Sequence, residues 1–300
     1  MDAGLRPRRP KVGAGSLSQV SQGNAEQQEF WESRAGVWDR RAQSVDSMSD
    51  AYGVPVMDAL ALQPGQRVLD VGCGPGTTTV ELARRVGAEG EVLGVDISAG
   101  MVASAIRRSA AAGLGHVRFV VADAQTAPLG EDFDAAFSRF GVMFFADPVS
   151  AFANIGRSLR PGGRLACAVW GPLGDNPWMF VPTLAAVEVL KAELVLPAPG
   201  QPGPFSLDTE ERLREVLTGA GFREVDVEPV SGSRHVTEAE AGDNLTTLLA
   251  IGPLGDAYAG ADDESRRLAV EAAASALAPY RDGEGWNLPG LALKVSALRP

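Results

Sequence analysis

The sequence predicts an α/β fold in which helices flank a mostly parallel β-sheet. From about residue 68 to residue 230, short β-rich runs alternate with stretches of helical periodicity, which is the pattern of right-handed βαβ units. The first run, residues 68–71, leads into three alternating glycines, and a lone carboxylate, Asp96, ends the second run. These observations predict a sheet whose carboxyl edge binds a nucleoside.

The glycine turn comprises Gly72, Gly74 and Gly76. Glycine lacks a Cβ atom, so the chain can adopt positive φ and its N–H groups can approach a ligand closely. Asp96 stands twenty residues past Gly76, where an acid can accept hydrogen bonds from both ribose hydroxyls. The turn and this acid together predict contacts to the sugar of a nucleoside.

Two details favour an amino-acid-bearing nucleoside over a dinucleotide. Thr77 occupies the position at which a dinucleotide site has its third glycine. Asp70 lies two residues before the first glycine, and its negative charge suits an ammonium group better than two phosphates. A nicotinamide oxidoreductase built on a similar turn stays open as an alternative.

Three further runs extend the predicted sheet, at residues 119–124, 133–138 and 159–165. The third strand brings Asp123 to the same edge as Asp96, where it can meet an exocyclic amine. Ile97 and Met101 lie one helical turn apart after the second strand, so they could sandwich an adenine. Apolar side chains would also stand at these two positions in any helix start.

The order of these five segments resembles that of the class I S-adenosylmethionine-dependent methyltransferases, in the broad group that includes the quinone-biosynthesis methyltransferases. The resemblance extends over residues 24–300. It implies a Rossmann-like sheet of seven strands, mostly parallel, with the last strand, near residues 291–298, inserted antiparallel between strands five and six. It also implies S-adenosylmethionine as the cofactor.

The resemblance carries cofactor contacts to matching positions. Asp70, Gly72 and Gly74 would contact the methionine moiety, and Asp96 would hold the ribose. Ser138 and Phe140 would line the floor near the sulfonium. The expected cofactor-binding residues are Asp70, Gly72, Cys73, Gly74, Gly76, Asp96, Ile97, Met101, Asp123, Ala124, Ser138, Phe140 and Trp38.

A mixed apolar and aromatic wall is expected on the acceptor side, from the loops after strands four and five. The expected substrate-binding residues are Arg139, Met143, Phe144, Trp170 and Trp178. Aromatic rings near a sulfonium or a flat acceptor contribute ~0.5 to 2 kcal/mol. Trp31 and Trp38 are seven residues apart on one helix face, which either closes over the cofactor or packs the helix on the sheet.

The chain has two histidines, and topology separates them. His116 precedes the third strand, at the amino end of the sheet, so we expect a structural role. His235 follows strand six on the carboxyl side, and we hypothesise that it is the general base. A base accelerates methylation of a hydroxyl or phenol by roughly a hundredfold to ten-thousandfold, whereas a carboxylate or amine acceptor needs little help.

Four parts are predicted along the chain. Residues 1–23 form a disordered leader, residues 24–61 an N-terminal helical cap, and residues 62–230 with 290–300 the cofactor-binding domain. Residues 231–289 hold two helical stretches, 238–249 and 264–277. We interpret this insertion as a substrate lid, because ligands bind at the carboxyl ends of parallel strands. Helices that extend the core or form a dimer contact are the alternative.

Composition favours a cytoplasmic enzyme with a small partner. The formal net charge is −11, which disfavours nucleic acid because phosphate neutralisation needs a basic face. No apolar run reaches membrane-spanning length. Cys73 and Cys167 are predicted to be reduced and buried, and two histidines give no zinc spacing. No metal site is expected, and a homodimer is left open.

The predicted function is methyl transfer from S-adenosylmethionine to a small organic or peptide-like acceptor by in-line displacement, without a metal. The aromatic wall favours a planar or apolar acceptor of secondary metabolism. The segment 138–141 contains no proline, unlike the nucleobase-methylating enzymes of similar fold. The alternative of another class is a protein that binds S-adenosylmethionine without catalysis, in a regulatory or assembly role.

Overall fold

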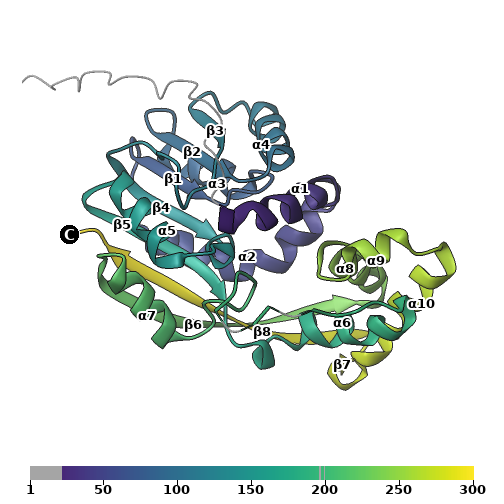
Figure 1. Ribbon diagram of the computed structural model, residues 1–300. Coiled ribbons are helices and arrows are strands. Elements are labelled where there is room, and N and C mark those ends of the chain that lie inside the picture. Colours follow the sequence, from purple (N-terminus) through teal and green to yellow (C-terminus); the bar gives the residue numbers. More distant parts are fainter. Residues whose placement is uncertain (1–21, 196, 199) are drawn as a thin grey trace, which may run out of the picture.

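The computed structural model describes residues 22–195, 197–198 and 200–300. One eight-stranded sheet, ordered β3-β2-β1-β4-β5-β8-β6 with the short β7 beside β8, runs through these residues (Figure 1). The predicted leader lies outside the described residues, except for its last two positions, which begin the 3-10 helix η1 (Gln22–Asn24).

The strands confirm the predicted α/β class. β1 to β5 pair in parallel, and β8 lies antiparallel between β5 and β6. The two-residue β7 is a strand that the sequence did not predict. The strands are β1 (Arg67–Val71), β2 (Glu91–Asp96), β3 (Val117–Val121), β4 (Phe133–Arg139), β5 (Leu159–Trp170), β6 (Arg223–Thr237), β7 (Arg281–Asp282) and β8 (Gly285–Leu298).

Helices cover both faces of the sheet. On one face α2 and α3 bury apolar side chains against the sheet, and on the other face α5 and α7 do so. Val68 faces the first layer and Leu69 the second, because successive side chains of a strand alternate. The helices of this part are α1 (Ala25–Arg40), α2 (Ala42–Ala59), α3 (Thr77–Val86), α4 (Ala99–Ala111), α5 (Pro148–Ser158) and α7 (Glu210–Gly219).

Helix α7 begins at a capping threonine. Its N-cap is Thr209, whose hydroxyl accepts from the Arg212 N–H at 3.3 Å. Threonine is a favourable residue at this position because its oxygen satisfies a free backbone N–H of the first turn. Gly221 follows the helix with a φ of 91°.

Strands β6 and β8 are longer than expected. They stay paired from Ser231 and Leu291 to Thr237 and Gly285, beyond the point where the other strands end. We call residues 231–237 and 285–291 the ribbon. It carries a helical subdomain at one end of the molecule (Figure 1), made of α6 (Pro177–Leu190), α8 (Glu238–Ile251), α9 (Gly255–Gly260) and α10 (Asp263–Ala276).

The helical subdomain contains both predicted insertion helices, as α8 and α10. It also contains α6, which precedes β6 in the chain and packs against α10. Separate apolar clusters hold these helices together, with Leu245 and Trp286 in one and Leu249 and Tyr258 in the other. The subdomain therefore has its own small core beside that of the sheet.

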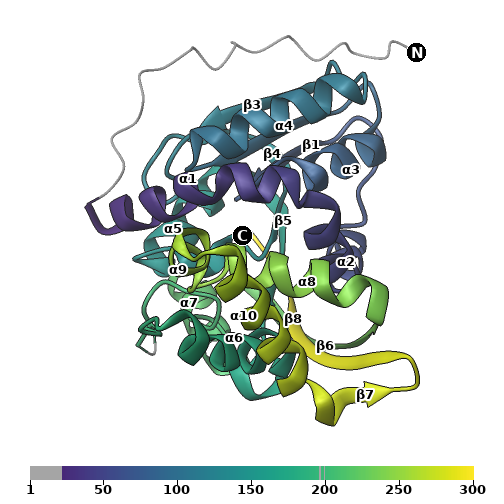
Figure 2. The same ribbon diagram turned by 90° about the vertical axis from the view of Figure 1, so that its right-hand side faces the viewer.

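Helix α1 lies between the sheet domain and the helical subdomain (Figure 2). On the sheet side, Glu32 accepts from the Ser98 hydroxyl at 2.6 Å and the Gly100 N–H at 3.1 Å, at the start of α4. On the other side, Arg34 reaches Asp256 of α9 at 3.5 Å. Helix α1 thus borders the carboxyl edge of the sheet, where ligands bind in open α/β folds.

Candidate functional site

The glycine turn after β1 has the predicted backbone conformation. Gly72, Gly74 and Gly76 have φ of 67°, 52° and 87°. A Cβ added at Gly72 would lie 2.9 Å from the Gly141 Cα, and one at Gly76 would lie 2.7 Å from Ala105, but one at Gly74 would meet nothing within 4 Å. Gly72 and Gly76 therefore allow close packing, whereas Gly74 faces the open cradle of the turn.

Asp70 places a buried carboxylate beneath this turn. Its Oδ2 accepts from the Thr78 and Thr79 hydroxyls at 2.8 and 2.6 Å, and its Oδ1 has no hydrogen-bond partner among the described residues. Burial raises the pKa of Asp70 from 3.8 to about 6. A buried acceptor without a donor is costly, so the site suits a ligand that brings a positively charged donor.

Asp96 provides a second acceptor at the end of β2. Its Oδ2 accepts from the Gly74 N–H at 2.8 Å and its Oδ1 from the Ser98 N–H at 2.9 Å. Burial raises its pKa as well. Each carboxylate oxygen accepts more than one hydrogen bond, so the backbone amides fix the carboxylate and leave acceptor capacity for two hydroxyl groups.

The expected adenine region is more closed than the sequence suggested. Asp123 is 1% exposed, and its Oδ1 accepts from the Asn24 amide and the Gln125 N–H, both at 2.9 Å. Met101 is buried and Ile97 is half-buried. A ligand amine at Asp123 would have to share the carboxylate with Asn24, a residue for which the sequence gave no signal.

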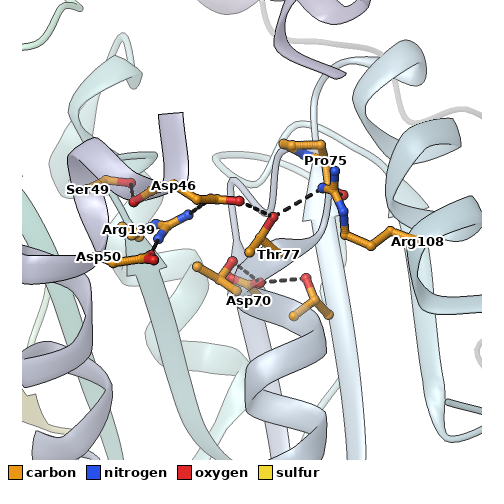
Figure 3. A network of polar contacts seen from close by, with 10 residues as sticks. Asp46, Ser49, Asp50, Asp70, Pro75, Thr77, Arg108 and Arg139 are labelled. Carbon is orange, nitrogen blue, oxygen red and sulfur yellow. Dashed lines mark hydrogen bonds and ion pairs between the residues drawn. The ribbon is translucent and has the colours of Figure 1, made fainter. Parts of the chain in front are cut away.

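Arg139 lies at the glycine turn, which we also call the cofactor turn, and links it to helix α2 (Figure 3). Its guanidinium donates to Asp46 and Asp50, both at 2.6 Å. Asp46 also accepts from the Thr77 hydroxyl at 2.9 Å, and Arg108 donates to that hydroxyl at 3.1 Å. A cavity of about 230 Å³ adjoins this network, lined by Trp38, Ala42, Asp46, Cys73, Pro75, Thr77 and Arg139.

Two expected contact residues lie inside the protein. Ser138 is fully buried and donates to the Val71 carbonyl at 2.7 Å, which ties β4 to β1. Met143 is 1% exposed, and its sulfur accepts from the Trp170 N–H at 3.3 Å. Both side chains already have internal partners, so this structure gives them a supporting position behind the site.

Four aromatic side chains form a continuous wall. Phe140, with a φ of 62°, stacks on Trp170 at 3.9 Å between ring centroids, and Trp170 meets Tyr52 and Trp178 edge-on at 5.1 and 5.4 Å. These geometries are favourable for aromatic pairs. The wall connects the segment beside the glycine turn to the helical subdomain.

The two tryptophans of α1, Trp31 and Trp38, also make edge-on aromatic contacts. Trp31 meets Trp38 at 5.7 Å and Phe144 at 4.8 Å. Trp38 lines the smaller cavity, while Phe144 packs beside the core. Trp31 therefore packs against the sheet domain and Trp38 borders the glycine turn, while closure of this face over the cofactor stays a prediction.

A larger cavity opens between the ribbon and the helical subdomain. It holds about 610 Å³ of empty space, part of it open to solvent. Trp178 is the one predicted substrate residue on its wall. The lining residues are Tyr52, Trp178, Arg234, Val236, Ala241, Asn244, Leu245, Leu248, Leu277, Trp286 and Leu288.

The histidines differ in placement. His116 lies at the amino end of the sheet, with Nε2 3.1 Å from the Ala83 carbonyl, which agrees with a structural role. His235 is exposed and pairs with Asn287 in the ribbon. Its neighbours Arg234 and Val236 line the larger cavity, so alternation along the strand turns His235 to the opposite face. This placement speaks against His235 as general base.

The described residues lack two kinds of feature. Residues 22–195, 197–198 and 200–300 contain no group of three or more histidine, cysteine or acidic side chains arranged to hold a metal. The same residues include no helix with the length and hydropathy needed to cross a bilayer. Cys73 and Cys167 are buried, as predicted, and both are free cysteines in this structure.

Several known proteins are similar to this chain in sequence. A family profile described as "Methyltransferase domain" matches residues 68–163. The chain is 38% identical over 103 residues to aklanonic acid methyltransferase DauC of Streptomyces sp. (strain C5), which covers 34% of this chain and 47% of that protein. It is 29% identical over 222 residues to the ubiquinone/menaquinone biosynthesis C-methyltransferase UbiE of Idiomarina loihiensis, covering 66% of this chain and 86% of that enzyme.

Among solved structures, the [4+2]-cyclase SpnF superposes with a TM-score of 0.55 at 22% identity, over 95% of this chain and 99% of that one. This likeness concerns the fold alone. The chain spans less than half the length of the first curated relatives that it matches. The profile, the relatives and the glycine turn agree: residues 68–163 match a methyltransferase domain, and the chain is similar to the methyltransferases of quinone biosynthesis.

Proposed function

We propose that this protein transfers a methyl group from S-adenosylmethionine to a small organic acceptor. The observation that carries this proposal is the pair of buried carboxylates at the glycine turn: Asp70 accepts from the Thr78 hydroxyl, and Asp96 accepts from the Gly74 N–H, where a Cβ would meet nothing within 4 Å. Asp70 suits the ammonium of the methionine moiety, and Asp96 suits the two ribose hydroxyls. Both requirements belong to one ligand.

The reaction itself asks mainly for alignment. The nucleophile of the acceptor attacks the methyl carbon, the carbon–sulfur bond breaks, and the electron pair stays on sulfur, which leaves as a neutral thioether. The positive sulfonium is already a good leaving group, so the step calls for no Lewis acid. Positioning of the two reactants supplies up to ~7 to 11 kcal/mol of such a barrier.

We place the acceptor in the larger cavity. The wall of Phe140, Trp170 and Trp178 leads from the cofactor turn to this cavity, and the helical subdomain covers it as a substrate lid. The cavity lining contains no Asp, Glu or His. An acceptor atom that reacts without a general base, or one that is ionised before binding, fits this lining best.

The kind of acceptor follows from size and charge. A planar or apolar small molecule of secondary metabolism matches the aromatic wall, and the similarity to the aklanonic acid methyltransferase supports this class. The formal net charge of −11 argues against a nucleic-acid substrate. A peptide-like acceptor remains within the proposal.

Calorimetry with S-adenosylmethionine and S-adenosylhomocysteine tests the cofactor half of the proposal. We expect binding of both molecules. A panel of planar phenols and acids, with S-adenosylhomocysteine release as the readout, tests the transfer itself. An absence of binding to either nucleoside would refute the proposed function.

The same fold also supports a second candidate, a protein that binds the nucleoside without methyl transfer. The fold neighbour SpnF is named as a cyclase, so the architecture alone does not fix methyl transfer as the outcome. The lack of an acidic or histidine base in the cavity lining is compatible with this reading. Nucleoside binding without S-adenosylhomocysteine release across the panel would favour it.

A further inference from the structure

The polar groups on the wall of the larger cavity are mostly hydrogen-bond donors. Trp286 is 8% exposed, yet its indole N–H has no partner among the described residues, and the same holds for the buried indole N–H of Trp178 and the amide nitrogen of Asn244. Each buried donor without an acceptor costs roughly 1 to 3 kcal/mol. Three such donors around one cavity indicate that a ligand supplies the acceptors.

Arg234 adds positive charge to the same wall. It is half-buried among apolar side chains of the cavity, and one of its nitrogens donates to Oδ1 of Asn244 at 3.3 Å. Because the amide oxygen of Asn244 faces Arg234, the amide nitrogen is the atom left without a partner. The arginine therefore supplies charge and also orients the neighbouring amide.

Among the described residues, the lining contains no carboxylate, and Glu240, outside the lining in the first turn of α8, is the acid whose charge acts on Arg234. Its other members are aliphatic or aromatic, apart from the Tyr52 hydroxyl. A flat hydrocarbon framework would contact the leucines and the tryptophan rings, while an anionic oxygen would meet the donors. Hydrogen bonds between a charged acceptor and such donors are about twice as strong as neutral ones.

We propose that the cavity recognises a planar apolar molecule that carries a carboxylate, with Arg234 and Asn244 as the anion-binding pair. This inference rests on the proposed function, since it assigns the chemical class of the methyl acceptor. It concerns recognition of the carboxylate, and it leaves the atom that receives the methyl group unassigned. Tyr52 and Trp178 mark the side of the cavity that faces the cofactor turn.

The test compares two probes of equal shape, anthracene carboxylate and its neutral carboxamide. Their affinities for the full chain are measured by titration calorimetry, with S-adenosylhomocysteine present. We expect the wild type to bind the carboxylate about tenfold or more tightly than the carboxamide. The substitution Arg234→Met should remove this preference and leave the affinity for the carboxamide within about twofold.

Asn244→Leu, which keeps the size of the side chain, should reduce the preference by about threefold to tenfold. Arg223→Met is the matched control, because Arg223 is an exposed arginine of the same strand β6, outside the cavity. Equal affinity for the two probes in the wild type, no binding of either probe, or an equal loss in Arg223→Met would overturn the inference.

Binding of S-adenosylhomocysteine on the same samples separates this inference from the proposed function. A wild type that binds the nucleoside but does not discriminate between the probes refutes the carboxylate site alone. A wild type that discriminates between the probes but does not bind the nucleoside refutes the methyltransferase proposal alone. If Arg234→Met fails to bind the nucleoside and is misfolded, Asn244→Leu decides the question.

Discussion

The cofactor turn and the larger cavity differ in hydrogen-bonding character. Around the turn, three buried carboxylates accept hydrogen bonds, those of Asp70, Asp96 and Asp123, beside one indole N–H, that of Trp38, which has no partner among the described residues. Around the cavity, the side-chain groups without partners among the described residues are donors, on Trp178, Asn244 and Trp286. A cationic nucleoside rich in donors fits the first region, and an oxygen-rich acceptor fits the second. Each region should therefore reject the other's ligand.

The two regions also differ in how they are held. The cofactor turn is fixed by backbone amides and threonine hydroxyls within a few residues of β1 and β2. The cavity is assembled from α2, α6, α8 and the ribbon, which come from distant parts of the chain. Side-chain contacts such as Arg34 with Asp256 join the subdomain to α1. We expect substitutions at the turn to have larger effects on nucleoside binding than substitutions at this junction.

The largest effect is expected for Asp96→Ala. The variant loses the acceptor for two ribose hydroxyls and the bond that fixes the Gly74 N–H, so affinity for S-adenosylhomocysteine should fall about a hundredfold or more. Calorimetry measures this loss. Asp175→Ala, an exposed acid outside both cavities, is the control and should bind as the wild type does. Unchanged affinity in Asp96→Ala would show that the cofactor turn does not bind the nucleoside.

Asp70→Asn should weaken nucleoside binding by about tenfold, because a neutral amide cannot pair with the ammonium. The folded-state pKa of Asp70, about 6, lies above its ordinary 3.8. Its contribution to stability is therefore present below the ordinary pKa and is lost as the pH rises through about 6. The asparagine variant escapes this loss, so its melting temperature should exceed that of the wild type at about pH 8 but not at about pH 4.

The same ionisation should make nucleoside binding depend on pH. The ammonium pairs with the charged form of Asp70, so wild-type affinity should rise between about pH 5 and pH 7. In Asp70→Asn this rise should disappear. Calorimetry at several pH values distinguishes the two cases, and an identical pH profile in both proteins would contradict the role of Asp70.

Gly74→Ala should affect binding more than folding. The added methyl group meets no protein atom within 4 Å, although φ is 52°. The left-handed conformation costs roughly 1 to 2 kcal/mol, whereas the methyl group would occupy the cradle and lower nucleoside affinity by about tenfold. Denaturation and calorimetry measure the two effects. Gly72→Ala serves as the contrast, since its Cβ would lie 2.9 Å from the Gly141 Cα and should destabilise the fold more.

Asp256→Ala should have the smallest effect. At the contact with Arg34, the Asp256 side chain is 88% exposed and the Arg34 side chain 6% exposed; because the carboxylate stays in water, the pair should contribute about 0 to 1 kcal/mol, as surface ion pairs do. We expect nucleoside affinity within about twofold of the wild type and a change in the free energy of unfolding below about 1 kcal/mol. A loss comparable to that of Asp96→Ala would show that the junction, and not the turn alone, controls cofactor binding.

Some features were predictable because they depend on neighbours in the sequence. The turn from Gly72 to Gly76 and the acids Asp70 and Asp96 follow from short motifs next to strands, and the antiparallel place of the last strand between strands five and six was implied by the family resemblance. His235 shows the limit of such reasoning. Topology placed it correctly on the carboxyl side, but which face of the ribbon it occupies depends on strands longer than the sequence suggested.

The sequence by itself determined the α/β fold, the glycine turn and the two carboxylates at the sheet edge, since local conformation and strand order produce them. Only the tertiary structure decided that Arg139 joins Asp46 and Asp50, that Ser138 turns inward, and that α6 enters the helical subdomain. The tertiary structure also forms the larger cavity, because its wall combines side chains that lie as far apart in the sequence as Tyr52 and Leu288. The physical reason is that these contacts depend on packing between distant segments, and no pattern of neighbouring residues specifies that packing.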